Sequence, residues 1–243
     1  MTAVGKYIRE LFMGKLSDDS KKIILNARQK RILREQGIPV EYENLVESQK
    51  EAIVAIEEML KAAEYKYKKK FAYAGYIPGT AFEEEQLIAY PEDGSREDDS
   101  FTIKRQMKNG RMDYQDDYIN IAVKPLFEKY LENFFVSEQE AGRVKVFAEV
   151  TKTDLLKVPE DFSDFDGNII SVNTIFIDGE CFEYKKFNAL MDNYREWLKN
   201  HRLPGGNEVI LLKDNVFDEV SEENYYDYYD EEYYICRADC DLN

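Results

Sequence analysis

Histidine is nearly absent from this 243-residue chain, and its scarcity excludes several kinds of active site. His201 is the single histidine, so the sequence cannot supply the two or three histidines of the common zinc centres. A nucleophilic triad would also have only this one imidazole as its base. His201 ends a predicted helix, where the helix dipole favours a cation, and we interpret it as a helix-terminal residue rather than a catalytic base.

Cysteines and long apolar runs are also few. The three cysteines, Cys181, Cys236 and Cys240, are an odd and low number that suits a reducing compartment better than a disulfide framework. Charged residues interrupt the apolar stretch at the start of the chain, unlike the core of a signal peptide. No apolar run has the length of a membrane span. We therefore expect a cytoplasmic protein that does not associate with membranes.

Signatures of bound phosphate, calcium or cofactors are missing as well. The glycines form no Gly-rich pattern ahead of a predicted helix, which excludes the usual phosphate-binding loops. Residues 161–168 are rich in aspartate, but an alignment to a calcium loop places Phe162 and Asn173 where essential carboxylate ligands belong. The sequence therefore predicts no cofactor and no bound metal.

Acidic residues, in contrast, are abundant. The chain has 49 acidic and 33 basic residues, which gives a formal charge of −16 and a pI near 4.7. A surface of this sign repels phosphate backbones, so we expect no nucleic-acid partner. Two interpretations of the charge stay open: it keeps the protein soluble, or it attracts a basic protein.

The order of helical and extended patterns predicts an α+β protein. Apolar residues at helical spacing indicate helices over residues 4–12, from Ser17 or Asp18 to about 36, and over 43–69 and 187–201. Strand patterns cover residues 71–76, 86–90, 101–107, 144–150, 169–177 and 209–212, and Asn109-Gly110 predicts a hairpin. The alternation of Ile119, Ile121 and Val123 predicts one more strand over 118–123, with Pro125 in the first turn of the helix that follows.

These patterns favour a largely antiparallel sheet with helices packed on one face, preceded by an N-terminal helical segment. The turn at 37–39 suggests a boundary, so we predict a helical appendage over residues 1–40 and a core domain over 41–213. Residues 214–243 differ in composition and are predicted to form an acidic, tyrosine-rich C-terminal tail. The sequence predicts no oligomeric state.

The tail is the strongest candidate for a binding segment. Nine acidic residues and six tyrosines fall between Asp214 and Tyr234. Carboxylates accelerate encounter with a basic partner, and tyrosine rings supply contact area at a small entropic cost. The predicted partner-binding residues are Tyr225, Tyr226, Asp227, Tyr228, Tyr229, Asp230, Glu231 and Glu232. We therefore predict a non-enzymatic protein that binds a basic protein, such as an inhibitor or immunity-type protein that neutralises a nucleic-acid-acting partner.

Two other functions stay open at this point. The first is a metal-assisted hydrolase, because Asp113, Asp116 and Asp117 form a cluster of carboxylates that could hold Mg²⁺. The second is a structural subunit that docks on a partner through the helices of residues 1–40.

Overall fold

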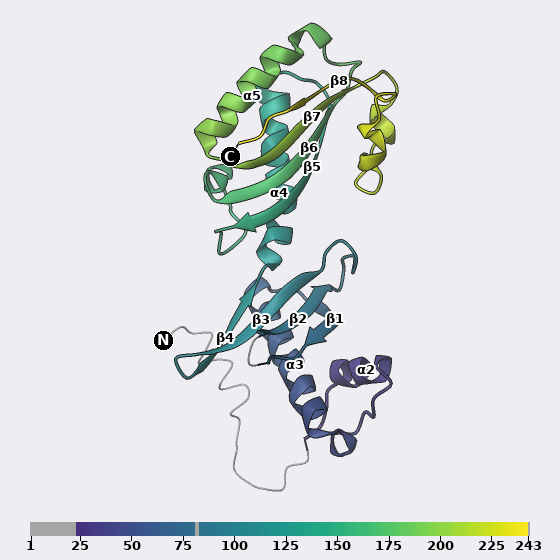
Figure 1. Ribbon diagram of the computed structural model, residues 1–243, viewed down its shortest axis with the longest axis vertical. Helices are drawn as coiled ribbons and strands as arrows, with labels where there is room; N and C mark the ends of the chain where they lie inside the picture. The colour runs from purple at the N-terminus through teal and green to yellow at the C-terminus, as the bar shows by residue number, and fades with distance from the viewer. Residues whose placement is uncertain (1–22, 81–82, 243) are drawn as a thin grey trace. The chain divides into compact units, whose positions relative to one another are not determined.

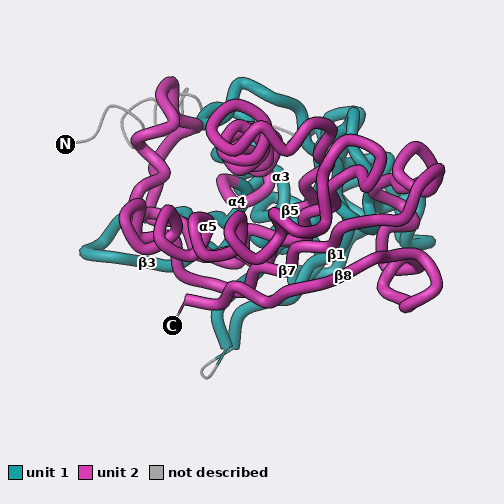
Figure 2. The backbone as a smooth tube through the Cα atoms, turned by 90° about the horizontal axis from the view of Figure 1, so that it is seen from above, with its two compact units in different colours: residues 1–118 teal, residues 119–243 magenta. Residues whose placement is uncertain are grey.

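The computed structural model describes residues 23–80 and 83–242 (Figure 1). The chain divides into two compact units, unit 1 (residues 1–118) and unit 2 (residues 119–243), which Figure 2 colours separately. Both units combine helices with strands, so the protein belongs to the α+β class, as predicted. Each unit has its own four-stranded sheet, whereas the sequence patterns had predicted a single sheet.

Unit 1 is a fully antiparallel sheet with helices. Its elements are α2 (Ala27–Glu35), η1 (Tyr42–Asn44), α3 (Glu47–Tyr67), β1 (Phe71–Ile77), β2 (Glu85–Pro91), β3 (Phe101–Lys108) and β4 (Arg111–Asp116). The strands follow the order β1-β2-β3-β4, which we call sheet 1. The hairpin predicted at Asn109-Gly110 joins β3 to β4, and both residues adopt the positive φ that this turn requires.

Helix α3 covers one face of sheet 1. Its apolar stripe is buried at Ile53, Ile56 and Leu60, as the helical spacing predicts. Phe71 at the start of β1 meets the rings of Phe101 and Tyr118 at centroid distances of 4.9 and 4.8 Å. Edge-on aromatic contacts of this kind add to the stabilisation that burial of apolar surface provides.

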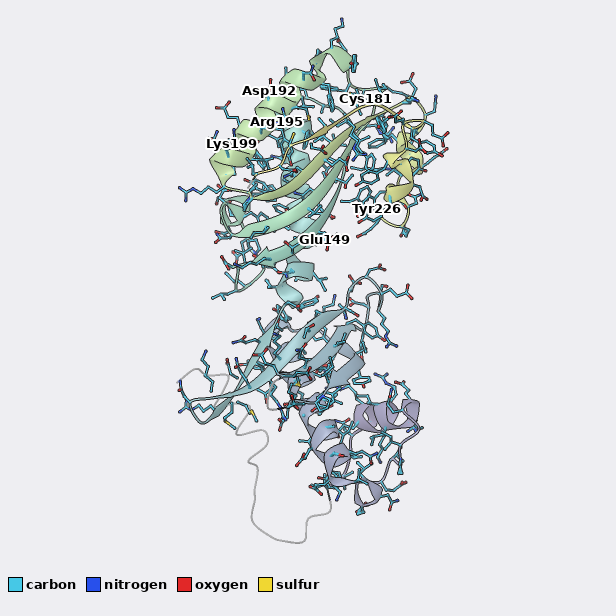
Figure 3. All side chains as sticks on the ribbon, viewed as in Figure 1. Glu149, Cys181, Asp192, Arg195, Lys199 and Tyr226 are labelled. Atoms are coloured by element: carbon cyan, nitrogen blue, oxygen red, sulfur yellow. The ribbon has the colours of Figure 1, made fainter. Side chains whose placement is uncertain are left out.

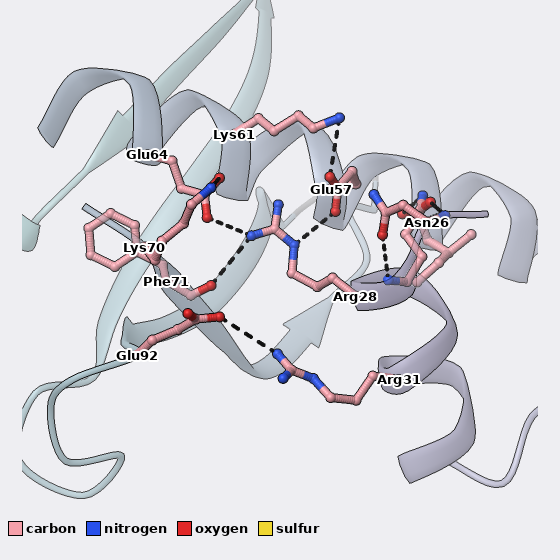
Figure 4. A network of polar contacts seen from close by, with 11 residues as sticks. Asn26, Arg28, Arg31, Glu57, Lys61, Glu64, Lys70, Phe71 and Glu92 are labelled. Carbon is pink, nitrogen blue, oxygen red and sulfur yellow. Dashed lines mark hydrogen bonds and ion pairs between the residues drawn. The ribbon is translucent and has the colours of Figure 1, made fainter. Parts of the chain in front are cut away.

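Helix α2 begins later than the sequence patterns suggested. Residues 23–26 are not helical, and Asn26 caps the helix through a side-chain oxygen that accepts a hydrogen bond from the Gln29 amide. The Gln29 side chain bonds back to the Asn26 amide, which completes a capping box (Figure 4). Ser17 and Asp18, the predicted caps, and the helix predicted over residues 4–12 lie outside the described residues.

A partly buried ion pair ties α2 to α3. The Arg28 guanidinium donates to Glu57 at 2.9 Å and to Glu64 at 2.7 Å, and it also reaches the carbonyl of Phe71 (Figure 4). Ile32 and Leu33 of α2 are buried as well. Helix α2 is thus part of the core of unit 1, and the division of the chain after Tyr118 differs from the boundary predicted near residue 40.

Unit 2 contains a mixed sheet. Its elements are α4 (Tyr118–Asn133), a π-helical turn η2 (Phe134–Glu138), β5 (Val144–Thr153), η3 (Phe162–Phe165), β6 (Ile169–Ile177), η4 (Tyr184–Lys186), α5 (Phe187–His201), β7 (Gly205–Leu212), η5 (Phe217–Glu219), η6 (Tyr225–Tyr229) and β8 (Tyr234–Asp239). The strand order is β5-β6-β7-β8, which we call sheet 2. Only β6 and β7 are parallel, because α5 connects them.

The strand predicted over residues 118–123 is wrong, since these residues begin helix α4. Four of the residues that α4 buries, Ile119, Val123, Phe127 and Leu131, recur every four positions. This helical spacing continues for three turns, whereas the two-residue alternation ends at Val123. Pro125 consequently lies inside the helix rather than in its first turn.

Helices α4 and α5 pack together on the inner face of sheet 2. Trp197 of α5 is buried and contacts Tyr130 of α4 and Phe134 of the turn η2, each at a centroid distance of 5.0 Å. A buried polar network lies below: Asn207 accepts hydrogen bonds from Tyr194 at 2.8 Å and from Asn173 at 2.9 Å. Because these bonds join β6, β7 and α5, they specify the register of the parallel pair.

The C-terminal residues belong to the fold of unit 2. Residues 234–239 form strand β8, and its pairing with β7 completes sheet 2. The segment before it, residues 213–233, lies on the outer face of the sheet, opposite α4 and α5 (Figure 1). The predicted boundary at residue 214 therefore falls inside a compact unit. Among the residues that the structure describes, no helix has the length and apolarity required to cross a membrane.

The pair between α2 and α3 generates the first prediction. Replacing Arg28 by Met should leave Glu57 and Glu64 without their main partner and lower the stability of unit 1 by roughly 3 kcal/mol. Hydrogen exchange of the α3 amides in the full chain measures this change, because exchange reports local unfolding free energies. The matched control is Arg31→Met. Arg31 makes an exposed pair with Glu92 at 3.9 Å, so its replacement should lower the stability of unit 1 by less than about 1 kcal/mol.

The loss of stability caused by Arg28→Met should depend on pH. Burial disfavours the ionised carboxylate of Glu57, but the hydrogen bonds and charges of Arg28 and Lys61 outweigh it and lower the pKa of Glu57. A carboxyl group with a lowered pKa stabilises the fold above its unfolded-state pKa, and this contribution disappears as the pH falls through the folded-state value. The cost of Arg28→Met should therefore decrease below roughly pH 4. A cost that is equal to that of Arg31→Met at every pH would contradict this account.

Candidate partner-binding surface

The outer face of sheet 2 is strongly apolar near one end. Cross-strand register places Phe147 beside Thr174, and Phe176 beside Ile210. Residues 213–233 cover this region and form a core with it: Phe176, Ile210, Leu212, Phe217, Val220 and Tyr228 are all buried there. The first part of the predicted tail thus forms a layer that packs on the outer face of sheet 2.

The tyrosines of the predicted binding segment have unequal roles. Tyr228 is 8% exposed and fills the core under η6. Tyr229 is half-buried, and its hydroxyl lies 2.6 Å from the Thr174 hydroxyl of β6. Tyr225 stacks on Phe147 of β5 at a centroid distance of 4.7 Å. Burial and the neighbouring Tyr226 raise the pKa of Tyr225. These three tyrosines hold the segment on the sheet.

Tyr226 is the exception, because it is 66% exposed. Its ring lies 4.1 Å from that of Tyr225 and 5.8 Å from that of Tyr229. We call Phe147, Tyr225, Tyr226 and Tyr229 the aromatic row. Contacts with the rings of Tyr225 and Tyr229 restrict the exposed Tyr226 side chain, so it has little conformational entropy to lose when a partner binds. Figure 3 labels Tyr226 and, on the same side of the sheet, Glu149.

Four carboxylates that follow Tyr226 in the chain are exposed. Asp227, Asp230, Glu231 and Glu232 all have exposed side chains. The Lys213 ammonium donates to the main-chain carbonyls of Glu231 at 3.1 Å and of Glu232 at 2.7 Å, so it orders the turn through main-chain oxygens. We call Tyr226, Asp227, Asp230, Glu231 and Glu232 the Tyr226 surface.

An uncovered apolar area lies on the same face of sheet 2. Alternation along β6 places Ile170 and Val172 on the outer face with Thr174 and Phe176, and Val172 is 52% exposed. Glu149 of β5 pairs with Val172 in the register and is exposed. The outer face therefore offers apolar side chains, an aromatic ring and carboxylates together.

Charge is distributed very unequally between the two units. Residues 119–243 contain 27 acidic and 13 basic residues, a formal charge of −14. Residues 1–118 contain 22 acidic and 20 basic residues, a formal charge of −2. The acidity that the sequence shows as a bulk property thus resides almost entirely in unit 2.

The carboxylate cluster predicted for a hydrolase lies in unit 1, and its members have separate partners. Asp116 accepts hydrogen bonds from Tyr67 at 2.5 Å and from Lys66 at 2.9 Å. Asp117 accepts one from the Thr102 amide. Asp113 lies on β4 near Gln115. Within residues 23–80 and 83–242, no group of three or more acidic, histidine or cysteine side chains is arranged to hold a metal ion.

His201 ends α5 as predicted, and its ring has polar partners. The Nδ1 atom lies 2.8 Å from the Tyr130 hydroxyl and 3.0 Å from Asp166. The Trp197 ring packs against it at 4.5 Å. The three cysteines are free thiols, and burial raises the pKa of Cys236 to about 11, which makes this thiol a poor nucleophile.

The sequence interpretation missed Phe147 and Thr174, the residues of sheet 2 that hold the tyrosines in place. A signal for a covered outer face was present in the sequence. Residues 175–177 and 209–212 are continuous apolar runs, which are typical of strands buried on both faces. A strict alternation of apolar and polar residues would instead have indicated strands with one face exposed to water.

Tyr228 and its neighbour Tyr226 provide a direct test of these unequal roles. Tyr228→Ala should destabilise unit 2 by about 3 kcal/mol, because it empties a core position. Tyr226→Ala should cost less than about 1 kcal/mol, because that ring is exposed. Trp197 is the only tryptophan and lies in unit 2, so its fluorescence during urea unfolding reports this unit. Equal losses in the two variants would contradict the packing described above.

The chain matches no protein-family model, and no curated protein matches it. Among solved structures, it is similar to a crystal structure of a DUF5037 family protein from Ruminococcus gnavus. The sequence identity is 11% and the TM-score 0.36, over 68% of this chain and 78% of the other. A similarity this distant does not bear on function.

Proposed function

We propose that this protein binds a basic protein without catalysing a reaction, and that unit 2 makes the contact through the Tyr226 surface. The observation that carries the proposal is an exposed aromatic ring, held on a packed sheet, in a segment that also carries four exposed carboxylates. Exposed aromatic rings on a rigid support are frequent anchors of protein interfaces.

Charge and aromatic contact contribute to different steps of such binding. The formal charge of −14 on unit 2 attracts a basic partner over a distance and increases the rate of encounter. Tyr226 then supplies contact area and slows dissociation. Because Tyr225 and Tyr229 already hold this ring between them, binding loses little side-chain entropy.

A nucleic-acid-acting protein is the partner class that this charge fits best. Such proteins present basic surfaces to phosphates, so an acidic protein can occupy the same surface and inhibit them. An inhibitor or immunity-type role follows from this argument. The three free thiols suit a reducing compartment, and we place the interaction in the cytoplasm.

Binding kinetics test the proposal once the partner has been captured with the full-length protein and identified by mass spectrometry. The association rate should fall steeply between 0.01 and 0.15 M salt, as the Debye length decreases from about 30 Å to about 8 Å. Combined Asp227→Asn, Asp230→Asn, Glu231→Gln and Glu232→Gln substitutions should lower the association rate more than they raise the dissociation rate. Tyr226→Ser should do the reverse.

A control variant removes the same amount of charge elsewhere on unit 2. Glu138, Glu140, Glu183 and Asp192 are exposed and lie outside the Tyr226 surface. Their combined change to Gln and Asn should affect association less than neutralisation of the Tyr226 surface. Point substitutions are needed rather than deletion of residues 214–243, because deletion would remove β8 and the cover of sheet 2. A partner that binds all the variants equally well would refute the proposal.

A further inference from the structure

Strand β5 is an edge of sheet 2, and among the residues that the structure describes part of its main chain has no strand partner (Figure 1). The Ala148 amide donates to the Glu128 carboxylate of α4 at 2.9 Å, so this N–H points away from β6. In an antiparallel pair the direction of the main-chain groups repeats every second residue. The pairing of β5 with β6 is regular from Val144 to Val150, so the amides of Val144 and Val146 point away from β6 as well.

A hollow of about 440 Å³ lies beside this free edge. Its lining residues come from α4, from the first half of β5 and from the segment before η6: Pro125, Glu128, Lys129, Glu132, Val144, Lys145, Val146, Phe147, Val220 and Ser221. The Lys145 ammonium donates to the carbonyls of Phe217 and Val220, each at 2.7 Å. Lys145 thus holds residues 217–220 against β5, which fixes one wall of the hollow.

The opposite edge of the sheet is less open. The Asp239 carbonyl of β8 accepts a hydrogen bond from Arg195 of α5 at 3.0 Å. Arg237 and Asp239 place charged side chains along β8, a common protection against strand addition. On β5, by contrast, the residues with outward-pointing amides are Val144, Val146 and Ala148. Only the last of these is covered by a side-chain acceptor in the structure described here.

We propose that the β5 edge at Val144–Val146 binds an extended segment of a basic protein as an added strand, with Lys or Arg at alternate positions of that segment. The inference rests on the proposed function, since it gives the binding mode of the same basic partner. Main-chain hydrogen bonds provide the affinity in strand addition, and alternate side chains provide the specificity. The Glu128–Ala148 bond stays intact and limits the added strand to the Val144 end of β5.

The charges favour this occupant over a second copy of the chain. Pairing of β5 with β5 of another copy would bring two units of charge −14 together. A lysine-rich or arginine-rich strand instead brings charge opposite to that of unit 2 and comes close to Glu132, which lines the hollow together with Glu128, Lys129 and Lys145. The outer face of the added strand also adjoins Phe147, the first ring of the aromatic row. The edge and the Tyr226 surface therefore form a continuous binding region.

The test uses the full-length protein and synthetic peptides at 0.15 M salt. The probe is an eight-residue peptide of alternating Thr and Lys with blocked ends. Its matched control has the same charge but is N-methylated at every residue, so that it has no main-chain N–H to donate to β5. The unmodified peptide should bind and protect the Val146 amide from hydrogen exchange. The methylated peptide should bind at least about tenfold more weakly, because one or two main-chain hydrogen bonds are lost.

Two protein variants complete the test. Val146→Pro removes the outward amide without breaking the ladder with β6, and proline is tolerated on strand edges. It should weaken binding of the Thr-Lys peptide by at least about tenfold while the urea midpoint stays close to that of the wild type. Glu132→Gln should weaken binding of this peptide and leave an alternating Thr-Glu peptide unaffected. If Val146→Pro lowers the urea midpoint, protection of the Val146 amide in the wild-type protein decides the matter alone.

The possible results separate this inference from the proposed function. Equal binding of the methylated and unmodified peptides would show adsorption to acidic surface and would overturn strand addition. A dimer of the free protein that Val146→Pro dissociates would overturn it in favour of self-pairing. Either result leaves the Tyr226 surface intact as a proposal, because that surface is tested by its own substitutions. Loss of partner binding in Tyr226→Ser together with unchanged binding in Val146→Pro would refute the β5 edge alone.

Discussion

The apolar outer face of sheet 2 is the constraint on which the C-terminal half of this protein depends. Phe176, Ile210 and Leu212 face outward, and each contributes about 1.5–3 kcal/mol when it is buried. Residues 213–233 cover them, and Tyr228 is buried in the contact. Once the apolar and aromatic side chains of this segment have turned inward, its carboxylates are left at the surface. The exposure of these carboxylates is thus a consequence of how the segment covers the sheet.

Unit 1 uses charge in a different way. Its acidic and basic residues are nearly equal in number, and a central pair is partly buried: Arg28 joins α2 to α3 through Glu57 and Glu64. An ion pair of this kind contributes more to the specific placement of a helix than to net stability, because desolvation offsets much of the attraction. Charged side chains therefore link helices in unit 1, whereas the carboxylates of residues 227–232 in unit 2 face solvent.

Rigidity connects the two proposed binding features of unit 2. Lys145 holds residues 217–220 beside β5, and Phe147 supports Tyr225 from the next outward position of the same strand. The strand that offers its edge is therefore also the strand that carries the aromatic row. A partner that engages both would meet a surface that is already ordered, which reduces the entropic cost of association.

The local patterns of the sequence determined the α+β class, the helix α3, the Asn109-Gly110 hairpin and the bulk acidity. Each of these follows from periodicity, turn chemistry or composition within a few neighbouring residues. Tertiary structure alone decided that the chain has two sheets rather than one, and that the C-terminal segment is half core and half surface. Those outcomes depend on contacts between distant residues, such as Tyr229 with Thr174 and Tyr225 with Phe147, which no local pattern encodes.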